Sequence, residues 1–334
     1  MTQKSKLFVT GGSGFIGTSV VSHFAGLGWE VRNFDTKPPN LREHDKMWVK
    51  GDVRDAAALR FAVVDFRPDF VLNMAAATGA HLKNLTADFF SANVAGVSHL
   101  IDAMAEARSV KRAIFVSSLL VCRNGYIPSS DTDYCAPNAY GQSKVDGEMV
   151  VRGRSPEIGD WVILRPTSVW GPWFEHSYRD YFRLLARGLY VNIPGVGDAV
   201  KPITFVDNAA YMMERFFAAD ASAVSGKTFY LVDYPEATIN LWTKTICAEL
   251  GRELPPTAPA WLIKSGARIG DGLVSLGWKN APLTTFRLNN MSTGGHYPYE
   301  KTAAVVGPLP HTMMDGVRKT VDWMRTQGLI AAAS

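Results

Sequence analysis

Tyr140 and Lys144 lie four residues apart in the segment APNAYGQSKVDGE and could form an acid–base pair. On a helix, side chains at this spacing share one face, with Cβ atoms about 5–6 Å apart. A phenol beside an ammonium group can exchange a proton with a substrate, but the same spacing also occurs in ordinary surface pairs. A second Tyr-x-x-x-Lys runs from Tyr297 to Lys301, so spacing alone does not identify the catalytic pair.

The segment TGGSGFIG near the N-terminus could bind a phosphate. Its glycines Gly11, Gly14 and Gly17 stand between an apolar β-rich run and a segment with helical periodicity. Glycine permits a tight turn and lets a pyrophosphate approach the helix N-terminus, where N–H groups such as those of Phe15 and Ile16 attract anions. The order of strand, glycines and helix predicts a dinucleotide-binding loop, although glycine-rich turns also occur without a ligand.

Asp35 is the candidate for binding the adenosine ribose. It ends a predicted strand and lies 18 residues after Gly17 (35 − 17). A carboxylate at this place can accept hydrogen bonds from the ribose hydroxyls and would repel a 2′-phosphate. Lys37 could tolerate that phosphate, so NADP stays open, but Asp35 favours NAD.

The elements that would position these residues alternate between strands and helices. Strands are expected at 6–10, 30–35, 47–52, 69–77, 112–118 and 161–171, and helices at 15–28, 55–66, 87–108 and 140–152. Most of these strands are nearly all apolar, which is typical of a parallel sheet covered on both faces. We therefore predict an α/β fold, a Rossmann-type doubly wound parallel sheet with a smaller C-terminal substrate-binding lobe.

The domain boundary is expected near residue 170, after which prolines and irregular spacing weaken the pattern. Residues 1–170 would form the NAD-binding domain, and elements near 203–217 and 228–251 would rejoin it. Residues 171–334 would mainly form the substrate-binding lobe. A chain of 334 residues has the length expected for two such units.

Composition places the chain among globular proteins, with 47% hydrophobic and 20% charged residues. The net charge of +4 and the absence of a dense Lys/Arg run give no reason to expect nucleic acid as a partner. No charge-free apolar run reaches about 18 residues, so no membrane span is expected. Three cysteines without a CxxC pair, and an N-terminus that enters a strand at once, favour the cytoplasm. No metal ligands are predicted.

Several short motifs occur along the chain in a fixed order: Gly-x-x-Gly-x-x-Gly, GDVRD, NMAAATG, VSS, YGQSK and RPTSVWGP. Together they resemble the extended short-chain dehydrogenase/reductase family, which contains the NAD-dependent sugar-nucleotide epimerases and dehydratases. The resemblance covers nearly the whole chain and is specific over the first 170 residues. It implies NAD as the cofactor and a nucleotide sugar as the substrate.

The resemblance also implies further contacts to the cofactor. The residues concerned are Asp52, Val53, Met74, Ala75, Ala76, Asn93 and Pro166, with Asp52 and Val53 near the adenine and Asn93 bracing the sheet. Other readings stay open, because Asp52 could cap a helix and Asn93 could be a buried, satisfied amide. The alanines could simply allow close packing.

Ser118 completes the catalytic set that the resemblance implies. It follows an apolar strand and lies 22 residues before Tyr140 (140 − 118), as in the Ser…Tyr-x-x-x-Lys triad of the family. Tyr297 is preceded by STGG and adjoins Pro298, with no serine at a strand end before it. Ser118, Tyr140 and Lys144 are therefore the predicted catalytic residues.

The energetics of Tyr140 fit such a role. A free tyrosine has a pKa of about 10, so acting as a base near pH 7 requires about 4 kcal/mol. One cation about 5 Å away in an effective dielectric of about 20 supplies about 3.3 kcal/mol. Lys144 would supply most of this, and the cationic oxidised nicotinamide could supply the rest.

Leu119 and Leu120 restrict the reaction. In related sugar 4,6-dehydratases an Asp-Glu pair follows the Ser/Thr, because eliminating water needs a second acid and base. Leucines cannot move protons, which leaves C4 epimerisation through a 4-keto intermediate, or simple reduction of a ketone. Asp35 favours the epimerase, since reductases more often use NADPH, so an isomerase is expected before an oxidoreductase or a lyase.

The substrate end departs from the family pattern. Ser168 replaces the usual asparagine, and Lys201 replaces an arginine that grips the diphosphate in relatives. Lysine can pair with phosphate but lacks the bidentate fork of arginine. Arg287 is a second candidate for phosphate, and His81 would border the pocket, although each could equally be a surface or packing residue.

Two other functions stay open. One is a keto-reductase of a nucleotide sugar or of the hydroxysteroid or dihydroflavonol type, which shares the triad. The other is a dinucleotide sensor without catalysis, which would be expected to lack Tyr140 or Lys144. The resemblance also implies a homodimer through the helices at 87–108 and 140–152. The first of these carries apolar residues beyond one stripe, such as Phe89 and Leu100.

Overall fold

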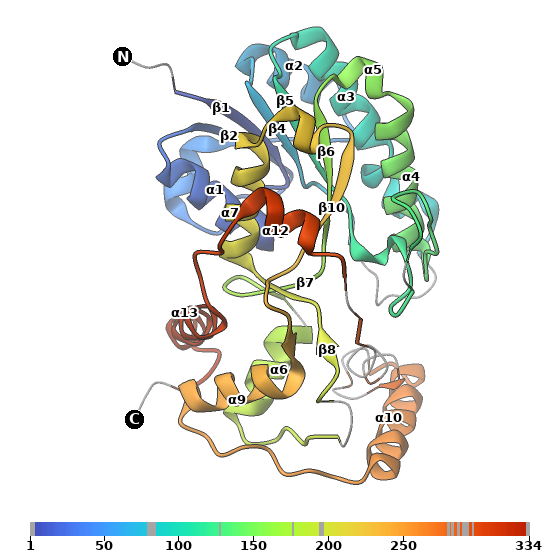
Figure 1. Cartoon of the computed structure of the whole chain (residues 1–334), viewed down its shortest axis with the longest axis vertical. Helices are drawn as coiled ribbons and strands as arrows, with labels where there is room; N and C mark the ends of the chain where they lie inside the picture. The colour runs from blue at the N-terminus through green and yellow to red at the C-terminus, as the bar shows by residue number, and fades with distance from the viewer. Residues whose placement is uncertain are drawn as a thin grey trace.

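The central feature of the computed structural model is a seven-stranded sheet in the order β10-β6-β5-β4-β1-β2-β3, with every neighbouring pair parallel (Figure 1). The strands are β1 (Lys6–Thr10), β2 (Glu30–Asp35), β3 (Trp48–Lys50), β4 (Phe70–Asn73), β5 (Arg112–Val116), β6 (Trp161–Pro166) and β10 (Lys227–Leu231). The structure describes residues 4–78, 85–126, 128–175, 177–193, 197–278, 281, 284–285, 288, 294–295 and 297–331. The predicted doubly wound α/β fold is confirmed.

Helices cover both faces of this sheet (Figure 1). On one face lie α1 (Phe15–Gly26), α7 (Val206–Ala218) and α12 (Glu300–Val306), and on the other lie α2 (Ala56–Phe66), α3 (Ala95–Ala107), α4 (Ala139–Gly153) and α5 (Ser155–Ile158). Alternate residues of a strand point to opposite faces, so Leu7 and Val9 join the first core cluster and Phe8 joins the second. All three are completely buried.

Local sequence signals set the ends of several helices. The side chain of Asp55 accepts a hydrogen bond from the N–H of Ala58 and begins α2. Thr312 and Asp315 form a reciprocal capping box at the start of α13 (Met313–Thr326). Gly251 ends α9 (Ile239–Leu250) in the left-handed conformation that glycine adopts without strain.

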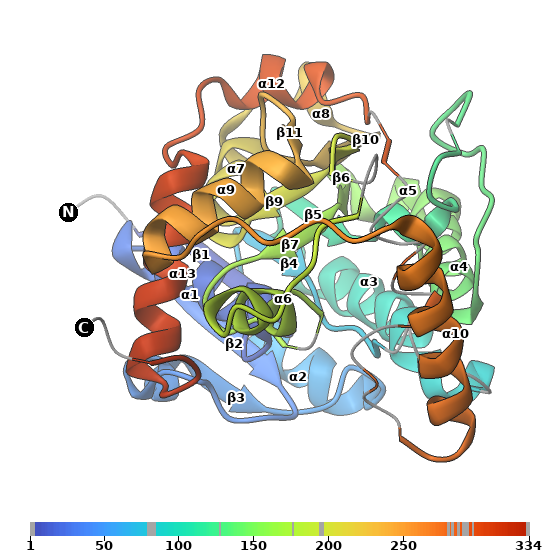
Figure 2. The ribbon, with the colours of Figure 1, turned by 90° about the horizontal axis from the view of Figure 1, so that it is seen from below.

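Below the sheet lies a smaller group of elements around Trp170 and Trp242. It contains the parallel pair β7 (Ser168–Trp170) and β9 (Ile203–Phe205), the antiparallel pair β8 (Val200–Lys201) and β11 (Ala237–Thr238), and the helices α6 (Ser177–Ala186), α9 and α13. The short α8 (Ala221–Val224) precedes β10, and α10 (Ala260–Ser275) lies at the periphery (Figure 2). The 3-10 turns are η1 (Arg42–Met47), η2 (Ala87–Asn93) and η3 (Leu119–Val121).

Two predicted elements are divided in the structure. The expected helix 87–108 is η2 followed by α3, with a break at Val94. Just before this break, the side chain of Asn93 bonds to Ala77 and to Ser143 on α4. The expected strand 161–171 is β6 followed by β7. The N–H of Thr167 still bonds to Leu231, but that of Ser168 bonds to Pro202, so the chain leaves the central sheet and pairs with β9.

The late segments also differ in position. β10 forms the edge of the central sheet beside β6, and α7 packs against α1. In contrast, α9 packs against α6 and α13 in the smaller group of elements. The division of the chain into a cofactor domain and a substrate lobe near residue 170 therefore stays a proposal.

Of the two apolar residues that suggested a dimer, Leu100 on α3 is covered within the chain, whereas Phe89 on η2 is 43% exposed. Leu100 is completely buried in the core between the sheet, α2 and α3. The outward side of α3 carries acids, with Glu106 paired to Arg60 and Asp102 paired to Arg154. The part of the argument that rests on Leu100 is therefore wrong, and the homodimer stays a prediction. Among the described residues, no helix is long and apolar enough to cross a bilayer.

Candidate active site

The predicted site residues gather where β1, β2, β4, β5 and β6 end. Because these strands are parallel, their carboxyl ends meet at one edge of the sheet, which is where open α/β sheets bind ligands. Thr10, Asp35, Asn73 and Pro166 are the last residues of β1, β2, β4 and β6. The edge is therefore built by the segments that the sequence motifs identified.

The glycine loop packs so closely that side chains cannot be accommodated. Gly11 has φ of +78°, and a Cβ there would lie 2.7 Å from the backbone nitrogen of Ala75. A Cβ on Gly17 would collide with the carbonyl oxygen of Gly11. A Cβ on Gly14 would meet nothing closer than that oxygen, at 3.4 Å. Gly11 and Gly17 therefore hold the loop against its neighbours, while Gly14 is the least crowded of the three.

The first turn of α1 presents backbone N–H donors beside Gly14. Phe15 and Ile16 open the helix, so their N–H groups have no acceptor within it. No side chain caps this end, since Gly14 is the N-cap residue. Free N–H groups beside an uncrowded glycine fit the pyrophosphate of a dinucleotide.

Asp35 is held against the glycine loop by two backbone donors. The N–H of Ser13 donates to Oδ2 at 3.0 Å, and that of Lys37 donates to Oδ1 at 2.9 Å. These bonds fix the carboxylate at the end of β2, next to the loop. Asp52, at the next strand end, is instead paired with Arg54, whose guanidinium holds the pKa of the Asp52 carboxyl below its usual range.

The segment after β4 is fixed from two sides. The hydroxyl of Thr10 accepts hydrogen bonds from the N–H groups of Met74 and Ala75, at 3.2 and 3.1 Å. The side chain of Asn93 bonds to both the N–H and the carbonyl of Ala77, and donates to Ser143 on α4 at 2.9 Å. Asn93 thus ties the loop to the helix that carries Tyr140. Ala76 lies within the braced segment, and Val53 is buried behind it.

Two of the three predicted catalytic residues, Ser118 and Tyr140, lie beside each other. Ser118 ends the segment after β5, and its hydroxyl is hydrogen-bonded to that of Tyr140 on the first turn of α4. Burial raises the pKa of Tyr140, and the bond to Ser118 opposes this shift. Lys144 follows one turn later and is only 7% exposed.

Lys144 interacts with the backbone and not with the phenol. Its Nζ donates to the carbonyl oxygen of Val116 at 3.0 Å. Burial lowers the pKa of Lys144 to about 8, and the carboxylate of Glu148 acts in the opposite direction. The sequence analysis expected Lys144 to lower the pKa of Tyr140. In the structure the pKa of Tyr140 is raised instead, because the loss of hydration on burial dominates.

Comparison with known proteins agrees with this geometry. The family model for the NAD dependent epimerase/dehydratase family matches residues 7–231, which include the glycine loop, Asp35 and the triad. The chain belongs to this family. The curated relatives that it resembles include the 3-beta-hydroxysteroid dehydrogenase of Mycolicibacterium neoaurum, 26% identical over 76% of this chain and 72% of that protein. Another is the 2-alkyl-3-oxoalkanoate reductase of Stenotrophomonas maltophilia, 26% identical over 94% and 98%.

Solved structures show the same fold at low identity. The UDP-glucose 4-epimerase of Thermotoga maritima, solved with UDP-glucose, has a TM-score of 0.70 at 20% identity, covering 96% of this chain and 99% of that one. The UDP-glucose 4-epimerase of Thermus thermophilus, solved with NAD, has a TM-score of 0.68 at 20% identity, with the same coverage. NAD is the cofactor of the family, and the cradle of Gly11, Gly14 and Gly17 beside Asp35 fits it.

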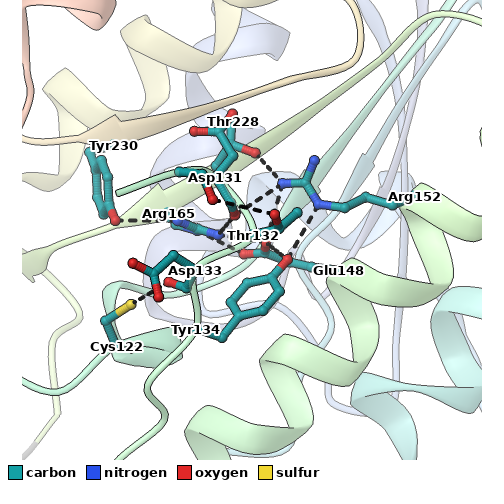
Figure 3. Close-up of polar contacts among 11 residues, drawn as sticks. Cys122, Asp131, Thr132, Asp133, Tyr134, Glu148, Arg152, Arg165, Thr228 and Tyr230 are labelled. Atoms are coloured by element: carbon teal, nitrogen blue, oxygen red, sulfur yellow. Dashed lines mark hydrogen bonds and ion pairs between the residues drawn. The ribbon is translucent and has the colours of Figure 1, made fainter. Parts of the chain in front are cut away.

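A buried ion pair that the sequence analysis did not identify links α4 to the central sheet (Figure 3). Glu148, one turn after Lys144, accepts hydrogen bonds from Nε and Nη2 of Arg165 at 2.9 and 2.8 Å. The two side chains are 2% and 1% exposed. This bidentate pair joins α4 to β6. The sequence does show Glu148 four residues after Lys144, but nothing in it indicates that Arg165 on β6 is the partner of this carboxylate.

The same pair also holds the segment that leads into Tyr140 (Figure 3). Tyr134 donates its hydroxyl hydrogen to Glu148 at 2.9 Å, and Arg165 donates to the carbonyl oxygen of Asp131 at 2.6 Å. Arg152 adds a bond to Thr228 on β10 at 2.6 Å. The catalytic helix is therefore attached to two strands and to the loop before it.

The substrate side is only partly described. Ser168 is hydrogen-bonded to Tyr178, and Lys201 is 5% exposed on β8, where burial lowers its pKa to about 8. His81 and Arg287 lie outside the described residues. Directly after Ser118, Leu119 packs with Tyr230 and Tyr297, whose rings are 5.1 Å apart. Tyr297, the tyrosine of the second Tyr-x-x-x-Lys, is thus a packing residue near Ser118.

Proposed function

We propose that the protein is an NAD-dependent nucleotide-sugar epimerase that inverts C4 through a 4-keto intermediate. The observation that carries this proposal is the Ser118–Tyr140 hydrogen bond at the edge of the sheet, followed by the leucines 119 and 120. This arrangement provides Tyr140 as a proton-transfer group, and the two positions directly after Ser118 offer no second acid or base. It supports oxidation and reduction at one carbon without elimination of water.

Each residue of the triad has a separate task in this reaction. Tyr140 would take the proton of the C4 hydroxyl and later return it, while Ser118 hydrogen-bonds the reacting oxygen. Lys144 supplies positive charge on the same face of α4. NAD, when bound, accepts the hydride from C4 and gives it back. For inversion, the keto intermediate must present its opposite face, so the substrate lobe has to allow the sugar to turn.

The nucleotide sugar would be held by its diphosphate. Lys201 on β8 is the described cation that corresponds to the diphosphate-binding arginine implied by the sequence, and Arg287 is the second candidate. A buried ammonium group with a lowered pKa gains most from a dianionic partner. The T. maritima and T. thermophilus epimerases with this fold, named for UDP-glucose, support this substrate class.

A second candidate is an NAD(P)H-dependent keto-reductase acting on an apolar ketone. The observation that favours it is the packing of Leu119 against Tyr230 and Tyr297, which gives the surroundings of Ser118 an apolar side. The hydroxysteroid dehydrogenase and the oxoalkanoate reductase among the relatives are named for such substrates.

Product mass separates these alternatives. The purified protein would be incubated with UDP-glucose, UDP-galactose and dTDP-linked sugars without added cofactor, and with a 3-oxosteroid and NADH or NADPH. Conversion of a sugar nucleotide to an isomer of unchanged mass supports the epimerase. A sugar product lighter by one water contradicts it. A product heavier by two hydrogens, formed only with added reduced cofactor, establishes the reductase instead.

A further inference from the structure

Helix α10 carries an unusual concentration of exposed apolar side chains. Trp261 is 69% exposed, Ile269 is 65% exposed, and Leu276 at the C-cap is 85% exposed. At 3.6 residues per turn, these three side chains fall within an arc of about 80°. Leu262, Val274 and Trp278 are exposed on the same segment. Contiguous exposed apolar surface of this kind marks a site of interaction.

The other side of the helix explains why this surface is left uncovered. The buried residues of α10 are Ala267 and Gly270, both small. They allow the helix to lie on the rest of the protein while its large side chains point away. Both views place α10 at the periphery of the molecule (Figures 1 and 2).

The arc next to the apolar one is basic. Lys264 and Arg268, one turn apart, are both exposed. Within the described part of the chain, neither forms an ion pair with a carboxylate. The nearest acid on the helix, Asp271, is engaged by the N–H and hydroxyl of Thr285. Asp271 shares this arc and keeps its negative charge, so the arc beside the apolar surface carries two positive charges and one negative charge.

We propose that α10 docks this protein onto an anionic lipid surface. A helix with Trp and Leu on one side and Lys and Arg beside them lies in the plane of the lipid headgroups. Trp261 in the first turn of α10 suits the interface, where amphipathic rings concentrate. A second copy of the chain would bring Lys264 and Arg268 toward an identical basic surface, whereas anionic headgroups complement them. The helix contacts the surface of the bilayer and does not span it.

Vesicle sedimentation tests the proposal with the full chain. The protein is mixed with sucrose-loaded vesicles of phosphatidylcholine, with or without phosphatidylglycerol. We expect it to pellet with the anionic vesicles. The double variant Ile269→Glu/Leu276→Glu is expected to lower the partition coefficient at least about tenfold, because it removes apolar insertion. Lys264→Gln/Arg268→Gln is expected to lower it about thirtyfold and to remove the preference for phosphatidylglycerol.

The matched control is Phe61→Glu, the same kind of change at a single phenylalanine on α2 that is 75% exposed. It is expected to leave vesicle binding unchanged. Wild-type protein that stays in the supernatant with anionic vesicles overturns the proposal, as do α10 variants that pellet like the wild type. So does a protein whose dimer, seen by light scattering without vesicles, is converted to monomer by Ile269→Glu/Leu276→Glu, since α10 would then cover a second copy.

Discussion

The hydroxyl of Tyr140 is the group on which the proposed chemistry depends, because it is hydrogen-bonded to Ser118 and carried on the same helix as Lys144. We expect Tyr140→Phe to lower kcat by about 10²–10⁴-fold, the usual contribution of one acid–base group. NAD binding, measured by titration calorimetry, is expected to survive. Tyr297→Phe is the control, since Tyr297 contributes its ring to packing. A Tyr140→Phe variant within tenfold of the wild type would refute the triad.

Glu148 is a positioning residue for Lys144. The pKa of Lys144 is about 8, so kcat is expected to fall as the pH rises through that value and the ammonium group loses its charge. The Glu148 carboxylate raises this pKa. Removing its charge in Glu148→Gln therefore lowers the pKa, and the basic limb of the kcat profile is expected to move to lower pH.

The control for Glu148→Gln is Asp146→Asn, which changes an exposed carboxylate on the same helix that bonds to Gln142. This variant is expected to keep the wild-type pH profile. Thermal unfolding checks that Glu148→Gln is folded, since Arg165 loses its partner. A folded Glu148→Gln enzyme with an unmoved basic limb would show that Glu148 acts only in stability.

Asp35 decides the choice of cofactor at this scale. Its carboxylate is fixed beside the glycine loop by the N–H groups of Ser13 and Lys37, where it would repel a 2′-phosphate. We expect titration calorimetry to give a clearly lower Kd for NAD than for NADP, and Asp35→Asn to reduce the difference. Equal affinities in the wild type would assign Lys37 the decisive role.

At the scale of elements, α4 and η2 approach so closely that only glycine fits between them. A Cβ on Gly147 would lie 2.6 Å from the carbonyl oxygen of Asn93. We expect Gly147→Ala to destabilise the protein by about 1–3 kcal/mol in urea unfolding, because backbone must move. Gly153→Ala, on the same helix with nothing within 4 Å, is expected to be neutral or slightly stabilising. Similar losses in both variants would contradict this account of the contact.

Much of the secondary structure could be predicted from the sequence, since strands β1 and β2 have the expected bounds. The apolar residues of β1 are nearly continuous, and a glycine after β1 and an aspartate at the end of β2 mark their ends. The strand that begins at Phe70 is shorter than expected, because the N–H of Ala75 bonds to the hydroxyl of Thr10, while that of Met74 is shared between this hydroxyl and the backbone carbonyl of Thr10. A tertiary hydrogen bond of this kind has no signature in the local pattern.

The remainder of the site depended on contacts between distant residues. Glu148 and Arg165 are 17 residues apart and lie on a helix and a strand, so either could have been a surface charge. The burial of Leu100 was misjudged for a related reason, since α2 covers a face that hydrophobicity alone left open. The glycine loop lies between a strand and a helix as expected, because its spacing is set within one strand–helix unit, while the catalytic role of Ser118, Tyr140 and Lys144 stays a prediction.

At the scale of the whole molecule, the oligomeric state is open to direct measurement. The resemblance to the extended short-chain family implies a homodimer through η2–α3 and α4. The described outer surface there includes Met149, which is 53% exposed, and Phe89, which is 43% exposed. We expect a dimer by light scattering at micromolar concentration, and its dissociation in Phe89→Glu/Met149→Glu. A monomeric wild type would exclude this interface.

The burial of the Arg165–Glu148 pair has a consequence for the response of the enzyme to ionic strength. Dissolved salt screens charges over a Debye length of about 8 Å at physiological concentration, but only where ions can enter. Surface pairs such as Arg60–Glu106, with side chains 61% and 42% exposed, lose their attraction in concentrated salt. The pair behind α4, 1% and 2% exposed, does not. We therefore expect the alignment of Tyr140 with the sheet edge to change little between dilute buffer and concentrated salt.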